Sequence, residues 1–139
     1  MLITELNYVR KGVYYNIQEF LSHVELHHSK NDLIVWDGDE IKLGSDRYKT
    51  FKFKGIKCKC GVEGKYFAKE RTHTKLPPKI ISYHLNLYGI RKDGTEVLMT
   101  KDHIIPKSKG GKNSIENYEP MCYDCNTEKS DQYVNENHT

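Results

Sequence analysis

The residues with the clearest chemical potential lie in the last third of the chain. Asp102 and His103 are adjacent, Asn117 follows them, and Asn126 comes directly after Cys125. A carboxylate or amide oxygen suits Mg²⁺, and an imidazole exchanges a proton near neutral pH. Taken alone, an Asp-His pair is more often an ordinary surface dipeptide. Together, the four polar side chains have the groups that metal-assisted hydrolysis requires, a cation site and a base that activates water.

Four cysteines form two close pairs that are far apart in the sequence, Cys58 with Cys60 and Cys122 with Cys125. Thiolates suit tetrahedral Zn²⁺, and nothing in the composition indicates an oxidising compartment. We therefore expect a four-cysteine zinc site rather than disulfides. Its role would be structural, because all four ligand positions are filled.

The upstream cysteine pair departs from the usual zinc spacing. Only Lys59 separates Cys58 from Cys60, and the tight turn would need the conformational freedom of Gly61. Two alternatives stay open. The cysteines are free thiols without a metal, or His73 replaces one of the upstream ligands.

Lysines gather beside the polar groups. Lys107, Lys109 and Lys112 lie in a loop around Gly110–Gly111, and Lys129 lies further along the chain. Such a loop can contact phosphate groups without reading base sequence. Lys129 is explained equally well as a solvated charge on a helix. We expect backbone contacts from the loop and regard Lys129 as a fourth candidate.

The net charge of +3 conceals an uneven distribution. Residues 1–41 carry three basic and seven acidic side chains. Residues 42–79 carry twelve basic and three acidic side chains, and residues 80–139 carry seven basic and nine acidic ones. A basic block between two acidic ones suggests a surface that faces a polyanion. The alternative is a solvated, lysine-rich loop.

The composition limits the class of protein. Only 37% of the 139 residues are hydrophobic and the mean hydropathy is −0.76, so the core is thin and a metal would help to hold it. No run approaches the ~18 apolar residues of a membrane span, and the start lacks a signal-peptide pattern. We expect neither a membrane protein nor a secreted one. Four aromatic residues in the basic block would stack on bases or, more simply, supply core around the zinc. They are Phe51, Phe53, Tyr66 and Phe67.

An alternating pattern predicts a hairpin that leads to the Asp-His pair. Apolar residues alternate over 83–87 and 97–99, on either side of an Asp93–Gly94 turn. At the end of the second strand, the chain can twist so that both side chains of 102–103 reach one site. A final helix is expected from about 121 to 133, where spacing puts residues 122, 125 and 126 on one face.

The first part of the chain predicts a helix and a second hairpin. Asn16 with Glu19 resembles a capping box, and apolar spacing predicts a helix from Asn16 to residues 29–32. Short strands are expected at 33–36 and 40–43, and residues 74–79 predict a stiff connector.

Two histidines on this predicted helix invite comparison with a zinc-protease motif. His23 and His27 have the spacing of H-E-x-x-H, but Glu25 comes one place late. On a helix this turns the glutamate about 100° from the required direction. We favour an ordinary amphipathic helix.

Residues 96–131 strongly resemble the HNH endonuclease family. The shared pattern is Asp-His, a loop with Pro and Gly-Gly, Asn-Tyr followed by Pro, and C-x-x-C-Asn with a Lys three residues on. The likeness extends loosely back to residues 45–51 and Cys58, where it looks like the small stand-alone HNH proteins of bacteriophages. The resemblance implies an α+β fold with a ββα-metal (His-Me finger) core around one divalent cation. It suggests an N-terminal extension, 1–44, and a zinc-stabilised nuclease domain, 45–139, in one compact unit.

The resemblance also implies a role for each matching residue. His103 would be the general base that activates water, and Asn117 would hold its imidazole in the working orientation. Asp102 and Asn126 would bind the catalytic cation. Asn126 stands where many members have His, and an amide oxygen favours Mg²⁺ or Mn²⁺ over a catalytic Zn²⁺.

These roles imply a metal-dependent HNH DNA endonuclease or nickase that acts on double-stranded DNA, as a monomer or a homodimer. Its location would be the cytoplasm of a bacterial host, if the chain is encoded by a phage. One alternative is a zinc-stabilised nucleic-acid-binding module without activity. Another is an accessory subunit of phage DNA packaging that is active only with a partner. The complete polar set favours the enzyme, because a pure binder has no need of it.

Overall fold

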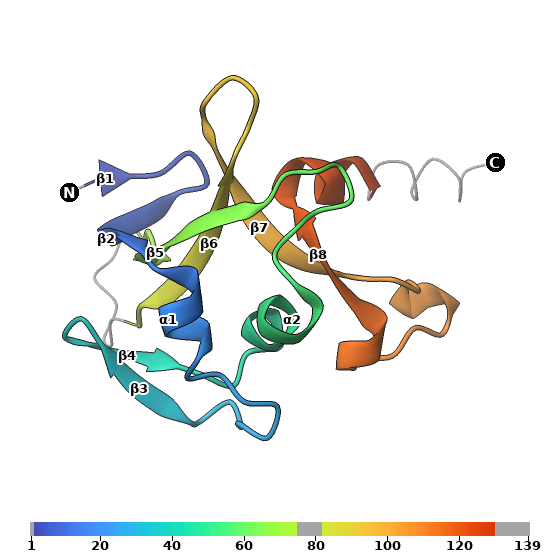
Figure 1. The fold of residues 1–139 in the computed structure, drawn as a ribbon, viewed down its shortest axis with the longest axis horizontal. Helices are drawn as coiled ribbons and strands as arrows, with labels where there is room; N and C mark the ends of the chain where they lie inside the picture. Colours follow the sequence, from blue (N-terminus) through green and yellow to red (C-terminus); the bar gives the residue numbers. More distant parts are fainter. Residues whose placement is uncertain (1, 75–81, 130–139) are drawn as a thin grey trace.

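A six-stranded antiparallel sheet dominates the fold (Figure 1). The computed structural model describes residues 2–74 and 82–129. The strands lie in the order β1-β2-β5-β6-β7-β8. Their bounds are β1 Leu2–Ile3, β2 Tyr8–Tyr15, β5 Gly64–Thr72, β6 His84–Ile90, β7 Glu96–His103 and β8 Tyr118–Cys122. The protein is therefore a mixed α+β structure that consists mainly of sheet.

Both predicted hairpins are confirmed. β6 and β7 pair around a turn in which Gly94 has a φ of 87°. A separate two-stranded sheet joins β3 (Leu33–Trp36) to β4 (Asp39–Lys42), one residue before the predicted second strand. Its turn places Asp37 and Gly38 at positive φ, which is the geometry that two-residue hairpins favour.

The predicted first helix is much shorter than expected. The Asn16 side chain caps it as predicted by accepting a hydrogen bond from the Glu19 amide at 2.8 Å, but α1 spans only Ile17–Leu21. Beyond its end, Lys52 donates to the Val24 carbonyl at 2.5 Å and Lys49 donates to the His28 carbonyl at 2.6 Å. These side chains satisfy carbonyl groups that further helical turns would have used.

The histidine pair of the protease-like pattern therefore lies outside any helix. Both His23 and His27 follow the end of α1. The prediction of an ordinary amphipathic helix across both histidines is wrong, and so the helical geometry from which we argued against a metal-binding motif does not apply there. Val24 is fully buried, as the apolar spacing predicted.

A helix that we did not predict, α2 (Asp46–Lys54), lies at the centre of the molecule. Ser45 caps its start by accepting a hydrogen bond from the Tyr48 amide at 3.1 Å. Phe51 and Tyr48 are buried, whereas Phe53 is 44% exposed. Figure 1 shows α2 between α1 and the β3–β4 hairpin on one side and the loop with the 3-10 helices η1 (Lys107–Lys109) and η2 (Ile115–Asn117) on the other.

The expected final helix begins later than predicted because a strand precedes it. Residues 118–122 form β8, which pairs with β7, and helical residues start at 123 and run to 129. The pairing places Thr100 opposite Met121 and His103 opposite Tyr118. The predicted continuation to 133 and residues 75–79 of the predicted connector lie outside the described residues.

One hydrophobic core joins the two ends of the chain. Phe20 and Val24 from the N-terminal part lie in the same buried cluster as Met99, Met121 and Cys122. Phe20 also packs its edge against Tyr48 and Phe67, so Phe51 and Phe67 supply core as expected.

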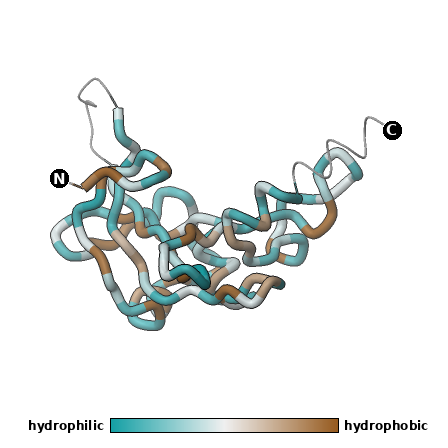
Figure 2. Tube along the Cα trace, turned by 90° about the horizontal axis from the view of Figure 1, so that it is seen from above, coloured by the Kyte–Doolittle hydropathy of each residue, from teal (hydrophilic) through white to brown (hydrophobic). Residues whose placement is uncertain are grey.

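Hydrophobic stretches along the chain are short. Figure 2 shows them alternating with hydrophilic ones over the whole described trace. Among residues 2–74 and 82–129, no helix has the length and apolar character needed to cross a membrane.

Candidate functional site

The candidate site gathers around the end of β7. His103 Nε2 lies 2.7 Å from Asn113 Oδ1, and its ring packs edge-on against Tyr118 with centroids 5.1 Å apart. A carbonyl oxygen can only accept, so Nε2 carries the proton in this contact. The neutral imidazole then has its basic lone pair on Nδ1, where it can accept a proton.

The Asp102 carboxylate is paired with a cation. Lys129 Nζ lies 2.8 Å from Asp102 Oδ2 and also donates to the His103 carbonyl at 2.8 Å. The side chain of Asp102 is only 21% exposed. Lys129 is therefore a positioned part of this site and not a freely solvated charge.

The amide of Asn126 has a fixed orientation. The Thr100 hydroxyl donates its only proton to the Met121 carbonyl at 2.7 Å. Its oxygen can then only accept, and Asn126 Nδ2 donates to it at 2.9 Å. The carbonyl oxygen of the amide consequently points away from Thr100, which leaves it available as a ligand for a hard cation.

Asn117 holds the loop that follows β7. Its side chain accepts from the Ile105 amide at 2.8 Å and donates to the carbonyls of Ile105 at 3.0 Å and Lys112 at 2.9 Å. These bonds tie both ends of the loop together. The imidazole contact expected from Asn117 comes instead from Asn113, so Asn117 acts on His103 only through the loop.

Two further residues contribute to the site without a recognisable sequence signal. Asn113 and Thr100 carry no signature of their own, because an isolated Asn in a lysine loop and a Thr in a strand are common. Their roles follow from the folded positions of the loop and of the β7–β8 pair.

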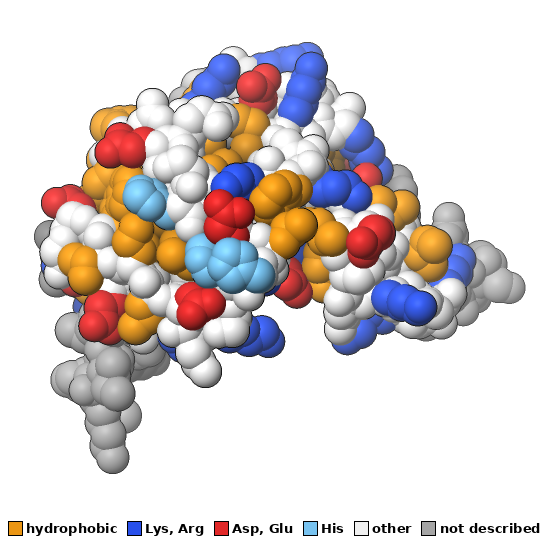
Figure 3. Space-filling view, turned by 60° about the horizontal axis from the view of Figure 1, so that its bottom comes forward, with side chains coloured by type: hydrophobic (Ala, Val, Ile, Leu, Met, Phe, Trp, Pro, Cys, Tyr) orange, Lys and Arg blue, Asp and Glu red, His pale blue; other side chains and the backbone are white. Residues whose placement is uncertain are grey.

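The lysines of the loop remain at the surface. Lys107 and Lys109 lie on η1 and Lys112 follows, all three exposed. Figure 3 shows lysine and arginine side chains over the end of the molecule that carries η1 and η2, with the surface hollowed between that end and the end formed by α1 and β3–β4.

The four cysteines meet as predicted. Their sulfur atoms all lie within 4.8 Å of one another, and Cys60 Sγ is 3.8 Å from Cys122 Sγ. Four thiolates around zinc at about 2.3 Å have sulfurs about 3.8 Å apart, so the cluster could hold zinc. Gly61 has a φ of 100°, as the tight turn required. His73 contacts Asn7 instead and is not part of the cluster.

The surroundings of the sulfurs also resemble a metal site. Burial raises the pKa of the Cys58 thiol, but amide hydrogen bonds from Cys60 and Cys122 outweigh it and hold this pKa below its ordinary value. Burial raises the pKa of the Cys122 and Cys125 thiols. Bound zinc would offset this effect of burial on the pKa, because it binds cysteine in the thiolate form and stabilises that form. Figure 1 shows the loop before β5 beside the start of the helical residues 123–129.

The comparison with protein families agrees with the site geometry. The family model described as HNH endonuclease matches residues 89–132, which include β7, β8 and every polar residue of the candidate site. No curated protein and no solved structure matches the chain.

Proposed function

We propose that this protein is a metal-dependent DNA endonuclease or nickase that hydrolyses phosphodiester bonds, since residues 89–132 match the HNH endonuclease family model. The observation that carries the proposal is the coincidence of this match with the arrangement at the end of β7. There, an imidazole, a carboxylate and an oriented amide lie beside an exposed lysine loop. Among the described residues, nothing favours a silent binding module or a packaging subunit.

His103 is the proposed general base. Asn113 accepts the proton of Nε2, so Nδ1 is free to take a proton from an attacking water. Tyr118 packs against the ring and restricts its rotation. Asn117 supports this arrangement indirectly by fixing the loop that carries Asn113.

Asp102 and Asn126 are the proposed ligands of the catalytic cation. The oxygen donors of these two residues fit such a cation. The Asp102 carboxylate already faces the ammonium group of Lys129, and the Asn126 carbonyl oxygen is directed away from Thr100. Oxygen donors suit Mg²⁺ or Mn²⁺. When bound, the cation would stabilise negative charge on the phosphate and on the leaving oxygen. Two strands and a helix at this site, β7, β8 and residues 123–129, support a ββα-metal core.

The cysteine cluster is a proposed structural zinc site. It joins the loop at 58–61 to the end of β8 and the start of the following helix. Four filled positions leave no room for a reacting water, so this zinc would hold the fold and take no part in cleavage. We propose that segments 1–44 and 45–139 act as one compact unit around it.

A plasmid assay tests the proposal. The purified protein should nick or cut supercoiled plasmid with Mg²⁺ or Mn²⁺, and His103→Ala should lose this activity. Lys92→Ala, an exposed charge in the β6–β7 turn, is the matched control and should keep it. Equal activity of the unaltered protein and His103→Ala, or silence of both with every metal, would refute the proposal.

A further inference from the structure

A hollow lined with basic residues lies beside the candidate site. It has a volume of about 550 Å³, and four of the side chains that line it are positively charged. We call these the groove cations, and they are Lys30, Lys42, Arg47 and Lys101. Asp46 is the acidic residue of the lining, so positive charge dominates.

The hollow reaches the proposed general base through one aromatic ring. Lys101 Nζ lies 4.1 Å from the centroid of the Tyr118 ring, and His103 packs its edge against the same ring. The Tyr118 hydroxyl donates to Asp46 Oδ2 at 3.2 Å. Lys101 and His103 are two residues apart on β7, so the pleat places them on the same face of the strand.

The groove cations are not neutralised by the protein. In the parts of the chain that the structure describes, none of them forms an ion pair, whereas Lys11, Lys69 and Lys129 each pair with a carboxylate at 2.7–2.8 Å. Arg47 Nε is buried without a hydrogen-bond partner. A buried donor without a partner carries a free-energy cost, which a bound acceptor would remove.

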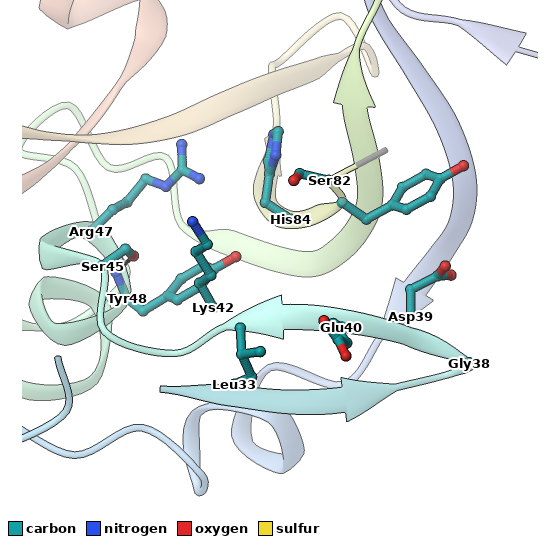
Figure 4. Close-up of a pocket in the computed structure, with 11 residues that line it drawn as sticks. Leu33, Gly38, Asp39, Glu40, Lys42, Ser45, Arg47, Tyr48, Ser82 and His84 are labelled. Carbon is teal, nitrogen blue, oxygen red and sulfur yellow. Dashed lines mark hydrogen bonds between the residues drawn. The ribbon is translucent and has the colours of Figure 1, made fainter. Parts of the chain in front are cut away.

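A second hollow extends the first. It has a volume of about 430 Å³ and shares Lys42, Ser45 and Arg47 with its neighbour. Figure 4 shows Lys42 from the end of β4, Arg47 from α2 and His84 from β6 around this space. The two hollows therefore adjoin at these three residues, and we refer to the pair as the groove.

We propose that this groove binds the phosphate backbone of the DNA strand that leads to His103, with the groove cations as its phosphate contacts. The inference rests on the proposed nuclease function and extends it to the path of the substrate. The lining of the groove includes Thr100, which bonds Asn126, and Lys101, whereas the lysine loop follows His103 along the chain. The strand would therefore contact cations from both. Such contacts position DNA without reading its sequence.

The salt dependence of DNA binding tests the groove. Fluorescence anisotropy of a labelled duplex is measured in Mg²⁺ over a range of KCl concentrations, with full-length His103→Ala protein that binds without cutting. Each lost phosphate contact should lower the slope of log K against log salt by about 0.9. Lys42→Ala and Arg47→Ala should each show this loss, and the double variant about twice as much. Arg47→Lys keeps the charge and should keep the slope.

Two further lysines provide matched controls. Lys65 and Lys92 are exposed and do not line either hollow, so Lys65→Ala and Lys92→Ala remove the same charge and should leave the slope unchanged. Zinc content and the midpoint of thermal unfolding identify variants that fail to fold. If Arg47→Ala fails to fold, Lys42→Ala, which changes an exposed residue, still tests the inference.

The outcomes separate this inference from the proposed function. If the unaltered protein cuts plasmid while the groove variants and the controls bind with the same slope, the groove is refuted and the nuclease proposal stands. If the protein cuts no DNA and binds none, both are refuted. A reduced slope confined to the groove variants supports the inference.

Discussion

At the residue scale, the candidate site depends on two kinds of side chain. Asp102, His103 and the cysteines could be recognised from residue type and spacing alone. Thr100 and Asn113 could not, because each acquires its role from a neighbour that the fold supplies. Thr100 fixes the amide of Asn126 only because β8 brings the Met121 carbonyl within reach of its hydroxyl.

We expect Thr100→Val to weaken the catalytic cation site. The variant keeps the shape of the side chain but loses the oxygen that accepts from Asn126 Nδ2, so the amide is free to rotate. Loss of such a supporting contact typically costs about 10- to 100-fold in metal affinity or activity. Titration with Mn²⁺ followed by electron paramagnetic resonance measures the affinity, and plasmid cleavage measures the activity.

Thr100→Ser is the matched control for this change. It retains the hydroxyl and should retain both Mn²⁺ affinity and cleavage. Unaltered Mn²⁺ binding by a folded Thr100→Val protein would show that Thr100 does not orient a metal ligand.

At the element scale, the sequence was least informative where local patterns and the fold disagree. Residues 51–54 alternate phenylalanine with lysine as a strand would, yet they belong to α2. Ser45 caps the start of this helix, and Tyr48 and Phe51, which are three residues apart, lie on its buried side. β8 contains Pro120, which argues against a strand in the interior of a sheet. β8 is the last strand of the sheet, where proline is tolerated.

The length of α1 also could not be predicted from the local sequence. Its capping residue was evident, and so were its buried positions. Its end was not, because the carbonyls beyond it are satisfied by Lys49 and Lys52 of α2, which lie far away in the sequence. Tertiary contacts of this kind leave no local pattern to read.

The loop between β7 and β8 provides a prediction at this scale. A Cβ on Gly111 would lie 1.8 Å from the Ile105 carbonyl oxygen and 2.9 Å from Asn117 Nδ2, so Gly111→Ala must displace the loop. We expect the variant to lose most plasmid cleavage, because Asn113 would no longer hold His103, while the zinc content stays the same. Cleavage rate and metal analysis measure the two effects.

Gly94→Ala provides the comparison for this loop. Gly94 has a positive φ of 87°, but a Cβ there meets nothing within 4 Å and the turn is remote from the candidate site. The variant should lose a little stability and keep its cleavage rate. Full activity of Gly111→Ala would mean that the loop can move without affecting His103.

At the scale of the whole molecule, a thin hydrophobic core is held together by contacts between distant parts of the chain. The core cluster includes residues of α1, α2 and β8, and the four-cysteine cluster lies at its edge, with Cys58 and Cys122 inside it. The low hydrophobic content indicated from the sequence that a metal would help. The expectation of one compact unit could not identify which residues of segments 1–44 and 45–139 share this core, since that depends on the order of the strands in the sheet.

We expect Cys60→Ser to lose zinc and with it much of the stability of the fold. Zinc binding contributes to folding free energy directly when the site forms only in the folded state. The purified variant should contain far less than one zinc per chain and unfold at a clearly lower temperature. His73→Ala is the control, since His73 was the alternative ligand, and it should keep its zinc. Retention of one zinc by Cys60→Ser would exclude Cys60 as a ligand.

Stability should also depend on pH through His84, which lies on β6 with Tyr8 packed edge-on against its ring. Burial, and secondarily the positive charge of Arg47, lower the pKa of His84 to about 4. The unfolded chain takes up this proton as the pH falls below about 6.5, whereas the folded protein does so only near 4. Folding stability attributable to His84 should therefore fall by about 2 kcal/mol between pH 7 and pH 5.

The measurement is urea unfolding of the unaltered protein and of His84→Gln at both pH values. His84→Gln removes the titrating group, so its loss of stability on acidification should be smaller by that amount. Protonation of cysteines and carboxylates affects both proteins alike and cancels in the difference. An equal loss in the two proteins would mean that His84 is accessible to protons in the folded state, and that the groove beside Arg47 is more open to water than its packing implies.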